Sequence, residues 1–280
     1  MKSDVSAHVG AHKLGLYIAV LGHGPAPIFL PLNENLPWKT GAVIDARVIS
    51  LRHGSDGGGG FCKTTTGENI YLRHTRGLHE GQMIHVKLQS EARGIKLAQG
   101  RQTSEALRAP TLQNVLTKFG NKTAISVASL ETLKKLRVVF PKDSFEFGTA
   151  DLELDNAAES ALNEVEISTS DVTIVCEATQ TAHHIDINGQ GRVSDINSKA
   201  ADLAINTIIS RNLGGIILID FLPPPTKLER QKIAKRVEDE LSQLPHRVKV
   251  HAMNESGHLI IERQRLASEF LRSYFGDEHD

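Results

Sequence analysis

The chain has 280 residues, of which 40% are hydrophobic and 23% charged, and its formal net charge at pH 7 is −1. This composition is typical of a globular protein with room for one large domain or about two or three small ones. No apolar run approaches the roughly 18–20 residues that a membrane helix needs. The N-terminus lacks the apolar core and the small-residue cleavage site of a signal peptide. We therefore expect a cytoplasmic protein without a membrane partner.

Cysteine and histidine do not form recognisable metal motifs. Cys62 and Cys176 lie far apart and no C-x-x-C occurs, so neither a disulfide framework nor a cysteine zinc site is expected. His183 and His184 are adjacent, and on a strand they would face opposite sides of a sheet. These two histidines therefore cannot share a metal ion.

The near-zero net charge conceals an uneven distribution. Between Arg73 and Arg108, seven Lys and Arg residues stand against three Glu residues, whereas acids dominate from Asp143 to Asp171. A nucleic-acid-binding domain is usually basic, so the total charge argues against such a partner. The basic segment nevertheless leaves room for one basic face.

Short β-rich segments follow one another across residues 41–99. Their regular spacing and glycine-rich connections predict a small antiparallel barrel. The run Gly57–Gly60 has the composition of a hairpin tip, or of a mobile loop without a task. The expected strands are ARVISL at 46–51, FCKTT at 61–65, ENIYL at 68–72 and MIHVKLQ at 83–89.

The middle of the chain is less regular. Residues 101–121 are polar and predict a connector, followed by a strand at 123–128. The spacing of Leu130, Leu133 and Leu136 then predicts a short amphipathic helix. Residues 151–163 have helical composition.

The C-terminal part predicts an α/β layer of about 100 residues with the order β-β-α-β-α-β-β. The segment IILIDF is an all-apolar strand of the kind buried in the centre of a sheet. Two glycines end the helix before it, and three prolines separate it from the helix after it. The expected strands are 172–178, 183–187, 216–221, 247–253 and 258–263, and the expected helices are 198–211 and 226–244.

Two aspartates stand out in this layer. Asp186 and Asp220 each end an otherwise apolar strand, in IDING and IILIDF. An ionised carboxylate at such a position is costly unless it meets a cation or hydrogen-bond donors. If the two strands are neighbours, both carboxylates and the amide of Asn188 form an oxygen-rich site suited to Mg²⁺. Helix-capping or turn residues are the structural alternative at this point.

The run IDINGQGRVSDINSKAADLAINTIISRNLGGIILIDF, residues 185–221, resembles the catalytic core of the RNase E/G family of endoribonucleases. The shared segments are IDING, NSKAAD, RNLGG and IDF, and the later VKVHAMNESGHLIIERQRLASEF resembles the closing hairpin of that family. The barrel-like region 41–99 resembles its embedded OB-fold module. The resemblance extends over most of residues 41–270 and is most specific in 172–266.

This resemblance implies an α/β protein with a DNase I-like catalytic layer fold and an OB-fold β-barrel inserted in or joined to an RNase H-like portion. The N-terminal strands of the RNase H-like portion would lie at 1–40 and the OB-fold RNA-binding barrel at 41–99. The rest of the RNase H-like portion, with the connector, would occupy 100–168. The DNase I-like catalytic domain would occupy 169–280.

The resemblance also assigns residues. The metal-binding aspartates of the family fall on Asp186 and Asp220, and its asparagine that orients water or phosphate falls on Asn188. Its RNA-gripping aromatics fall on Phe61 and Tyr71, which could alternatively belong to the barrel core. The RNA-contacting lysine falls on Lys96. Stacking of bases on aromatic rings beside a cation is the physics expected of a single-strand reader.

Several features of the family pattern are missing from this chain. The segment that senses a 5′-monophosphate has no counterpart between Gln99 and Thr123, and the cysteines of the zinc link are absent. A T-E-A segment reads Thr179-Gln180-Thr181 here. Glu255 stands where the family usually has Arg, and Ile260 where it has Glu.

The leading hypothesis is a Mg²⁺-dependent endoribonuclease that cleaves single-stranded RNA and leaves 5′-phosphate ends. Without the 5′ sensor, we expect precursor RNA such as ribosomal RNA ends to be processed. The resemblance allows a homodimer but no zinc-linked tetramer. The alternative is an RNA-binding protein of the same fold with weak or no catalysis.

Overall fold

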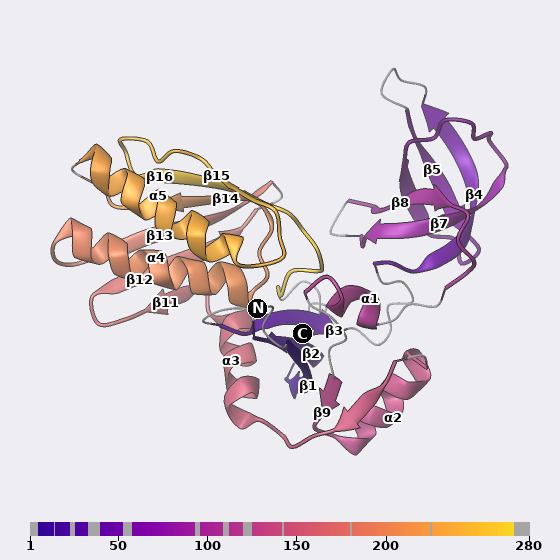
Figure 1. The fold of residues 1–280 in the computed structure, drawn as a ribbon, viewed down its shortest axis with the longest axis horizontal. Helices are drawn as coiled ribbons and strands as arrows, with labels where there is room; N and C mark the ends of the chain where they lie inside the picture. Colours follow the sequence, from indigo (N-terminus) through magenta and orange to yellow (C-terminus); the bar gives the residue numbers. More distant parts are fainter. Residues whose placement is uncertain are drawn as a thin grey trace, which may run out of the picture. The chain divides into compact units, whose positions relative to one another are not determined.

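The computed structural model describes residues 5–13, 15–22, 26–32, 40–52, 58–92, 96–108, 112–119, 125–141, 143–179, 181–224 and 226–271. The chain forms two compact units (Figure 1). The first unit comprises residues 1–33, 119–129 and 146–280, and the second comprises 34–118 and 130–145. Part of the expected glycine loop, residues 53–57, and Gln180 lie outside the described residues.

The second unit is built around a closed barrel with the strand order β4-β5-β6-β8-β7. Apolar residues at every second position point into it, because successive side chains of a strand face opposite sides. Its core includes Val48, Cys62, Leu72 and Val86, all at most 1% exposed. The strands are β4 (Val43–Arg52), β5 (Gly59–Thr64), β6 (Asn69–Arg73), β7 (Met83–Ser90) and β8 (Ala98–Thr103).

The predicted barrel is confirmed, but the prediction that it is antiparallel throughout is wrong. Strands β6 and β8 pair in parallel, with Ile70 opposite Ala98. Five strands cannot alternate direction around a closed ring, so at least one neighbouring pair must be parallel. The barrel also continues to Thr103, into the segment predicted as a connector. This strand order is consistent with an OB-like fold.

Two helices accompany the barrel strands in the second unit. Helix α1 (Leu112–Leu116) lies within the predicted connector, and α2 (Leu130–Val139) matches the predicted amphipathic helix. Asp143 accepts hydrogen bonds from the backbone N–H groups of Leu112 and Gln113, at 2.7 and 3.2 Å. Burial raises the pKa of the Asp143 carboxyl, while these two bonds act in the opposite direction.

The first unit contains a five-stranded sheet with the order β10-β9-β1-β2-β3. Helix α3 (Leu152–Asn163) packs on it, with Asp151 as its N-cap. Leu154, Ala158 and Leu162 of the helix pack with Tyr17, Phe29 and Phe270. The strands are β1 (Ser6–His12), β2 (Gly15–Leu21), β3 (Ile28–Leu32), β9 (Ile125–Val127) and β10 (Phe145–Phe147).

The first unit also contains a six-stranded sheet with the order β11-β12-β13-β14-β16-β15. The predicted order β-β-α-β-α-β-β is confirmed, with β11 as an additional edge strand. Helices α4 (Val193–Ser210) and α5 (Lys227–Ser242) lie side by side over one face of this sheet (Figure 1). The strands are β11 (Glu166–Ser168), β12 (Val172–Ala178), β13 (Ala182–Gly189), β14 (Gly215–Asp220), β15 (Val248–Val250) and β16 (His258–Arg263).

Helix α4 begins five residues before the predicted start at Ser198. Its first turn contains Ile196, which is 3% exposed, followed by the fully buried Asn197. The Asn197 side chain donates to the carbonyl of Leu222 at 2.7 Å. The inner face of α4 therefore includes a buried amide. A search for regularly spaced apolar residues does not detect such a position, so the predicted helix starts too late.

A buried polar group anchors the chain after β16. Glu269 is 1% exposed and accepts from the N–H of Gly214 and from Arg265, at 3.2 and 3.0 Å. Its other oxygen lies 3.2 Å from Nε2 of the equally buried His183. His184 is exposed on the opposite side of the strand. The prediction that these adjacent histidines face opposite ways is therefore confirmed.

We predict that Tyr17→Phe destabilises the first unit. Tyr17 is fully buried and its hydroxyl donates to Asp155 of α3 at 2.6 Å. Loss of a hydrogen bond to a charged group should lower the free energy of unfolding by about 1.5–3 kcal/mol. Urea denaturation measures this change. Tyr71→Phe in the other unit is the control and should change stability by less than about 0.5 kcal/mol; equal effects of the two substitutions would contradict the prediction.

Candidate active site

The site is built on the parallel pair β13 and β14. Their register places Asp186 directly opposite Asp220. Ile185, Ile187 and Ile219 are at most 3% exposed and point toward the helices. The intervening aspartates therefore point to the other face of the sheet, where both are exposed. Neighbouring strands lie about 4.7–4.9 Å apart, so the two carboxylates share one small area of that face.

Asn188 lies two residues beyond Asp186 on the same face of β13. Its Nδ2 donates to Oδ2 of Asp186 at 2.9 Å. This bond restrains the Asp186 carboxylate from one side. The structure thus brings together the three residues that the sequence analysis selected in this layer.

His258 extends the row to a third strand. Strand β16 runs antiparallel to β14 and places His258 opposite Asp220. Nε2 of His258 lies 3.3 Å from Oδ1 of Asp220. Asn254 completes the arrangement, because its Nδ2 lies 3.1 Å from Nδ1 of His258. The sequence analysis missed both residues, since only the β14–β16 register reveals that HLIIER begins beside Asp220.

The chain after Asp220 is held from two directions. The N–H of Phe221 donates to the carbonyl of Gly257 at 3.2 Å, and Asn197 holds the carbonyl of Leu222. Gly257 has a φ of +97°, and a Cβ there would lie 2.1 Å from the Phe221 carbonyl oxygen. Only glycine therefore allows the 254–257 turn to approach the end of β14 this closely.

The donor set fits Mg²⁺. Among the residues that the structure describes, no group of three or more His, Cys, Asp or Glu side chains is arranged to hold a metal ion. Mg²⁺, however, usually uses only one or two carboxylates and takes its other ligands from water and substrate phosphates. Two in-register carboxylates on an exposed sheet face correspond to that pattern. Asp186 and Asp220 are thus residues that could hold a Mg²⁺ ion whose other ligands are waters or phosphate oxygens.

The outer surface of the barrel carries the two aromatics selected from the sequence. Phe61 on β5 pairs with Tyr71 on β6, and their ring centroids are 5.7 Å apart in an edge-on arrangement. Both rings are half-buried and lie outside the barrel core. A Cβ on Gly59 would lie 2.4 Å from the Tyr71 hydroxyl, so glycine at this position leaves room for the ring. Lys96, just before β8, is exposed.

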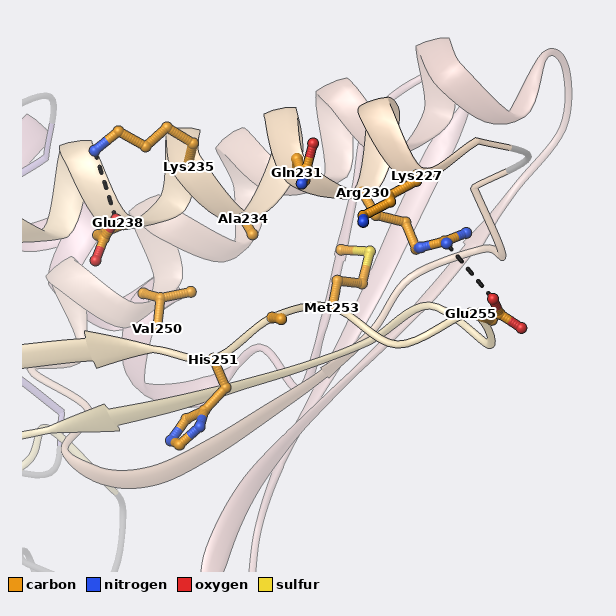
Figure 2. A pocket seen from close by; sticks show the side chains of 11 residues that line it. Lys227, Arg230, Gln231, Ala234, Lys235, Glu238, Val250, His251, Met253 and Glu255 are labelled. Carbon is orange, nitrogen blue, oxygen red and sulfur yellow. Dashed lines mark hydrogen bonds and ion pairs between the residues drawn. The ribbon is translucent and has the colours of Figure 1, made fainter.

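A groove of about 660 Å³ runs between α5 and the chain that follows β15 (Figure 2). Lys227, Arg230 and Lys235 contribute positive charge from the helix, and Glu238 and Glu255 contribute negative charge. Oε1 of Glu255 lies 3.8 Å from Nη2 of Arg230. The groove is thus of mixed charge, and Glu255 contributes part of its acidic side.

Comparison with known proteins identifies the family. The model of the ribonuclease E/G family matches residues 122–266, just over half of the chain. The chain belongs to the ribonuclease E/G family. No curated protein sequence matches it. The family match includes β12 to β16 with Asp186, Asn188 and Asp220, and it ends before the last described residues. The barrel lies outside the matched range.

Two of the residues noted in the sequence analysis as departures from the family pattern, Glu255 and Ile260, lie near the site. Ile260 is two residues beyond His258 on β16 and is 42% exposed on the face that carries the aspartates. Glu255 belongs to the turn that precedes His258 and is 92% exposed. Gln180 lies outside the described residues.

No helix among the described residues is both long and apolar enough to span a membrane.

We predict that Gly257→Ala disturbs the turn beside Asp220. A non-glycine residue at a strongly positive φ costs about 1–3 kcal/mol, and here the added methyl group would also overlap the Phe221 carbonyl. The measured quantity is the free energy of unfolding. Gly191→Ala is the matched control, because Gly191 also has a positive φ, +135°, but open space around it. Gly257→Ala should be the more destabilising of the two, and the reverse order would refute the close approach.

Proposed function

We propose that this member of the ribonuclease E/G family is a Mg²⁺-dependent endoribonuclease that cleaves single-stranded RNA. The observation that carries the proposal is the register of β13 and β14, which sets Asp186 beside Asp220 on an exposed sheet face. A ribonuclease family and a paired-carboxylate site support the same chemistry. The products would be a 5′-phosphate and a 3′-hydroxyl.

Each residue of the site has a proposed role. Asp186 and Asp220 would hold Mg²⁺, which lowers the pKa of a bound water and polarises the phosphate when it is present. Asn188, whose amide already contacts Asp186, would orient the attacking water or the scissile phosphate. Water adds to phosphorus and the bond from phosphorus to the 3′ oxygen breaks, with a proton transferred to that leaving oxygen. The exposed position of both acids allows a strand of RNA to approach them.

The barrel would grip the RNA strand. Phe61 and Tyr71 present adjacent rings on the outside of the barrel, and a base can stack on an aromatic ring whatever its identity. Lys96 would contact a phosphate. The region 41–99 would thus serve as an OB-fold RNA-binding module, and 169–280 as the DNase I-like catalytic domain.

We also propose an RNase H-like portion, a substrate class and an assembly. The strands within 1–40 and the elements within 100–168 would form an RNase H-like portion. The substrates would be precursor RNAs such as ribosomal RNA ends, processed in the cytoplasm. The resemblance allows a homodimer, and no zinc-linked tetramer is expected.

An RNA-binding protein without turnover is the second candidate. Gln180, Glu255 and Ile260 favour it, because each differs from the residue that the family pattern has at that position. Glu255 and Ile260 replace an Arg and a Glu close to His258. An additional acid in this turn and a lost carboxylate on the sheet face would both alter the binding of a phosphate. The intact set of Asp186, Asn188 and Asp220 favours the enzyme.

We expect Asp220→Asn to abolish cleavage while leaving RNA binding nearly unchanged. The substitution keeps the size of the side chain but removes one of the two charges that face the cation. Mg²⁺-dependent cleavage of precursor ribosomal RNA or of a generic single strand should fall on the order of 10²–10³-fold or more, as when a transition-state stabilising group is lost. Asp186→Asn should lose cleavage activity to a similar extent. A chelator of Mg²⁺ should stop cleavage by the unmodified protein.

Asp239→Asn is the matched control, because Asp239 pairs with Lys235 at 2.7 Å on α5, away from the site. Cleavage that survives in both site variants would place the activity elsewhere. Tight RNA binding without any cleavage by the unmodified protein would favour the binding protein.

Tyr71→Ala should weaken the binding of single-stranded RNA by about 1–3 kcal/mol, the usual contribution of one stacked base. Gly59→Ala should act through the same ring, because the added methyl group would displace it. The two effects should therefore not add in the double variant. Affinities measured by fluorescence anisotropy test this expectation, and additive effects would show that Gly59 acts independently of Tyr71.

A further inference from the structure

Asp220 has a partner on the strand opposite to Asp186. His258 lies across from it in the β14–β16 register, and Nε2 of the ring is 3.3 Å from Oδ1 of the carboxylate. The imidazole is 44% exposed and the carboxylate 49% exposed. A carboxylate this exposed turns freely unless a neighbour restrains it.

Asn254 determines which ring nitrogen of His258 carries the proton. Its Oδ1 accepts from the backbone N–H of His258 at 2.9 Å, so its Nδ2 must be the atom that faces the ring. Nδ2 lies 3.1 Å from Nδ1 of His258 and donates to it. In a neutral imidazole the proton is then on Nε2, the nitrogen that lies 3.3 Å from Oδ1 of Asp220.

The turn that carries Asn254 is itself firmly held. Its backbone closes through bonds from Gly257 N–H to the Asn254 carbonyl and from Asn254 N–H to the His258 carbonyl, both 3.2 Å. Met253, 7% exposed, points from this turn toward α5 beside Arg230 (Figure 2). Glu255 lies near Arg230 on the same side. The turn therefore holds His258 in a fixed position.

We propose that His258 is a positioning residue that orients the Asp220 carboxylate for the cation, with Asn254 setting the tautomer that this requires. The inference rests on the proposed role of Asp220 in binding Mg²⁺. One oxygen of each aspartate is engaged, Oδ2 of Asp186 by Asn188 and Oδ1 of Asp220 by His258. The second oxygen of each carboxylate would then be available to a cation. Groups that hold a ligating carboxylate in this way commonly contribute 10–100-fold in metal affinity or activity.

The test compares two replacements of His258 in the full chain. His258→Leu removes the donor, whereas His258→Gln places an amide N–H close to the position of Nε2. Mg²⁺ affinity is measured by calorimetry without RNA, and the Mg²⁺ concentration for half-maximal cleavage is measured with a single-stranded RNA. His258→Leu should weaken Mg²⁺ binding by about 10–100-fold and raise the Mg²⁺ requirement equally. His258→Gln should recover most of the loss, and RNA affinity should stay the same in both.

Asn254→Ala provides a second readout that a purely structural role would not affect. Nitrogen-15 NMR of the imidazole should show the proton on Nε2 in the unmodified protein and a mixture of tautomers in the variant. His184→Leu is the matched control, because His184 is exposed on the same face of the sheet, two residues before Asp186. Its Mg²⁺ affinity should equal that of the unmodified protein.

Three results would overturn the proposal in distinguishable ways. Unchanged Mg²⁺ affinity in His258→Leu, with a normal unfolding midpoint, would show that His258 does not position Asp220. Failure of His258→Gln to rescue, together with a preference of the unmodified protein for Mn²⁺ or Zn²⁺, would make His258 a direct ligand. Equal Mg²⁺ affinity of Asp220→Asn and the unmodified protein would remove the proposed metal site itself, and the inference with it.

Discussion

The parallel pairing of β13 with β14 is the constraint on which the candidate site depends. Its register is set by burial, because Ile185 and Ile187 must face the helices together with Ile217 and Ile219. A shift of one residue in the register would turn the whole apolar set of one strand toward solvent. The same alternation that forms the core therefore sets the two aspartates side by side. Helix α4 supplies the crossover that a parallel pair requires.

Around this pair of strands, polar side chains restrain the carboxylates of Asp186 and Asp220. Asn188 contacts Asp186 along the same strand, and His258 approaches Asp220 from the next one. The carbonyl of Gly257 and the side chain of Asn197 hold the two residues that follow the end of β14, Phe221 and Leu222. The groove along α5 ends in the same turn, through Met253 and Glu255 (Figure 2). Through a few hydrogen bonds, the 254–257 turn therefore links the groove beside α5, on one face of the sheet, with the aspartates on the other face.

In the barrel, the same alternation of side chains separates the residues that fill the interior from those on the outer surface. Val48, Cys62 and Leu72 fill its interior, whereas Phe61 and Tyr71 point outward. Burial of the Cys62 thiol raises its pKa to about 12, which keeps this cysteine an apolar core residue. The two rings contact each other on the outer surface and are the residues to which we assign RNA binding in our proposal. The membership in a ribonuclease family is consistent with such a surface.

The sequence by itself determined the order of elements in the C-terminal layer, the existence of the barrel, and the choice of Asp186, Asn188 and Asp220 as strand residues. These features are local, because they depend on alternation, on glycine and proline stops and on short motifs. The prediction that both aspartates end their strands holds for Asp220 and is wrong for Asp186, because β13 continues to Gly189. Only the tertiary structure decided the parallel β6–β8 pair, the early start of α4 at Val193, ahead of the buried Asn197, and the position of His258. Each of these depends on which strands become neighbours and in what register. The packing of the whole layer decides which distant segments pair and in what register. No local sequence pattern contains this information.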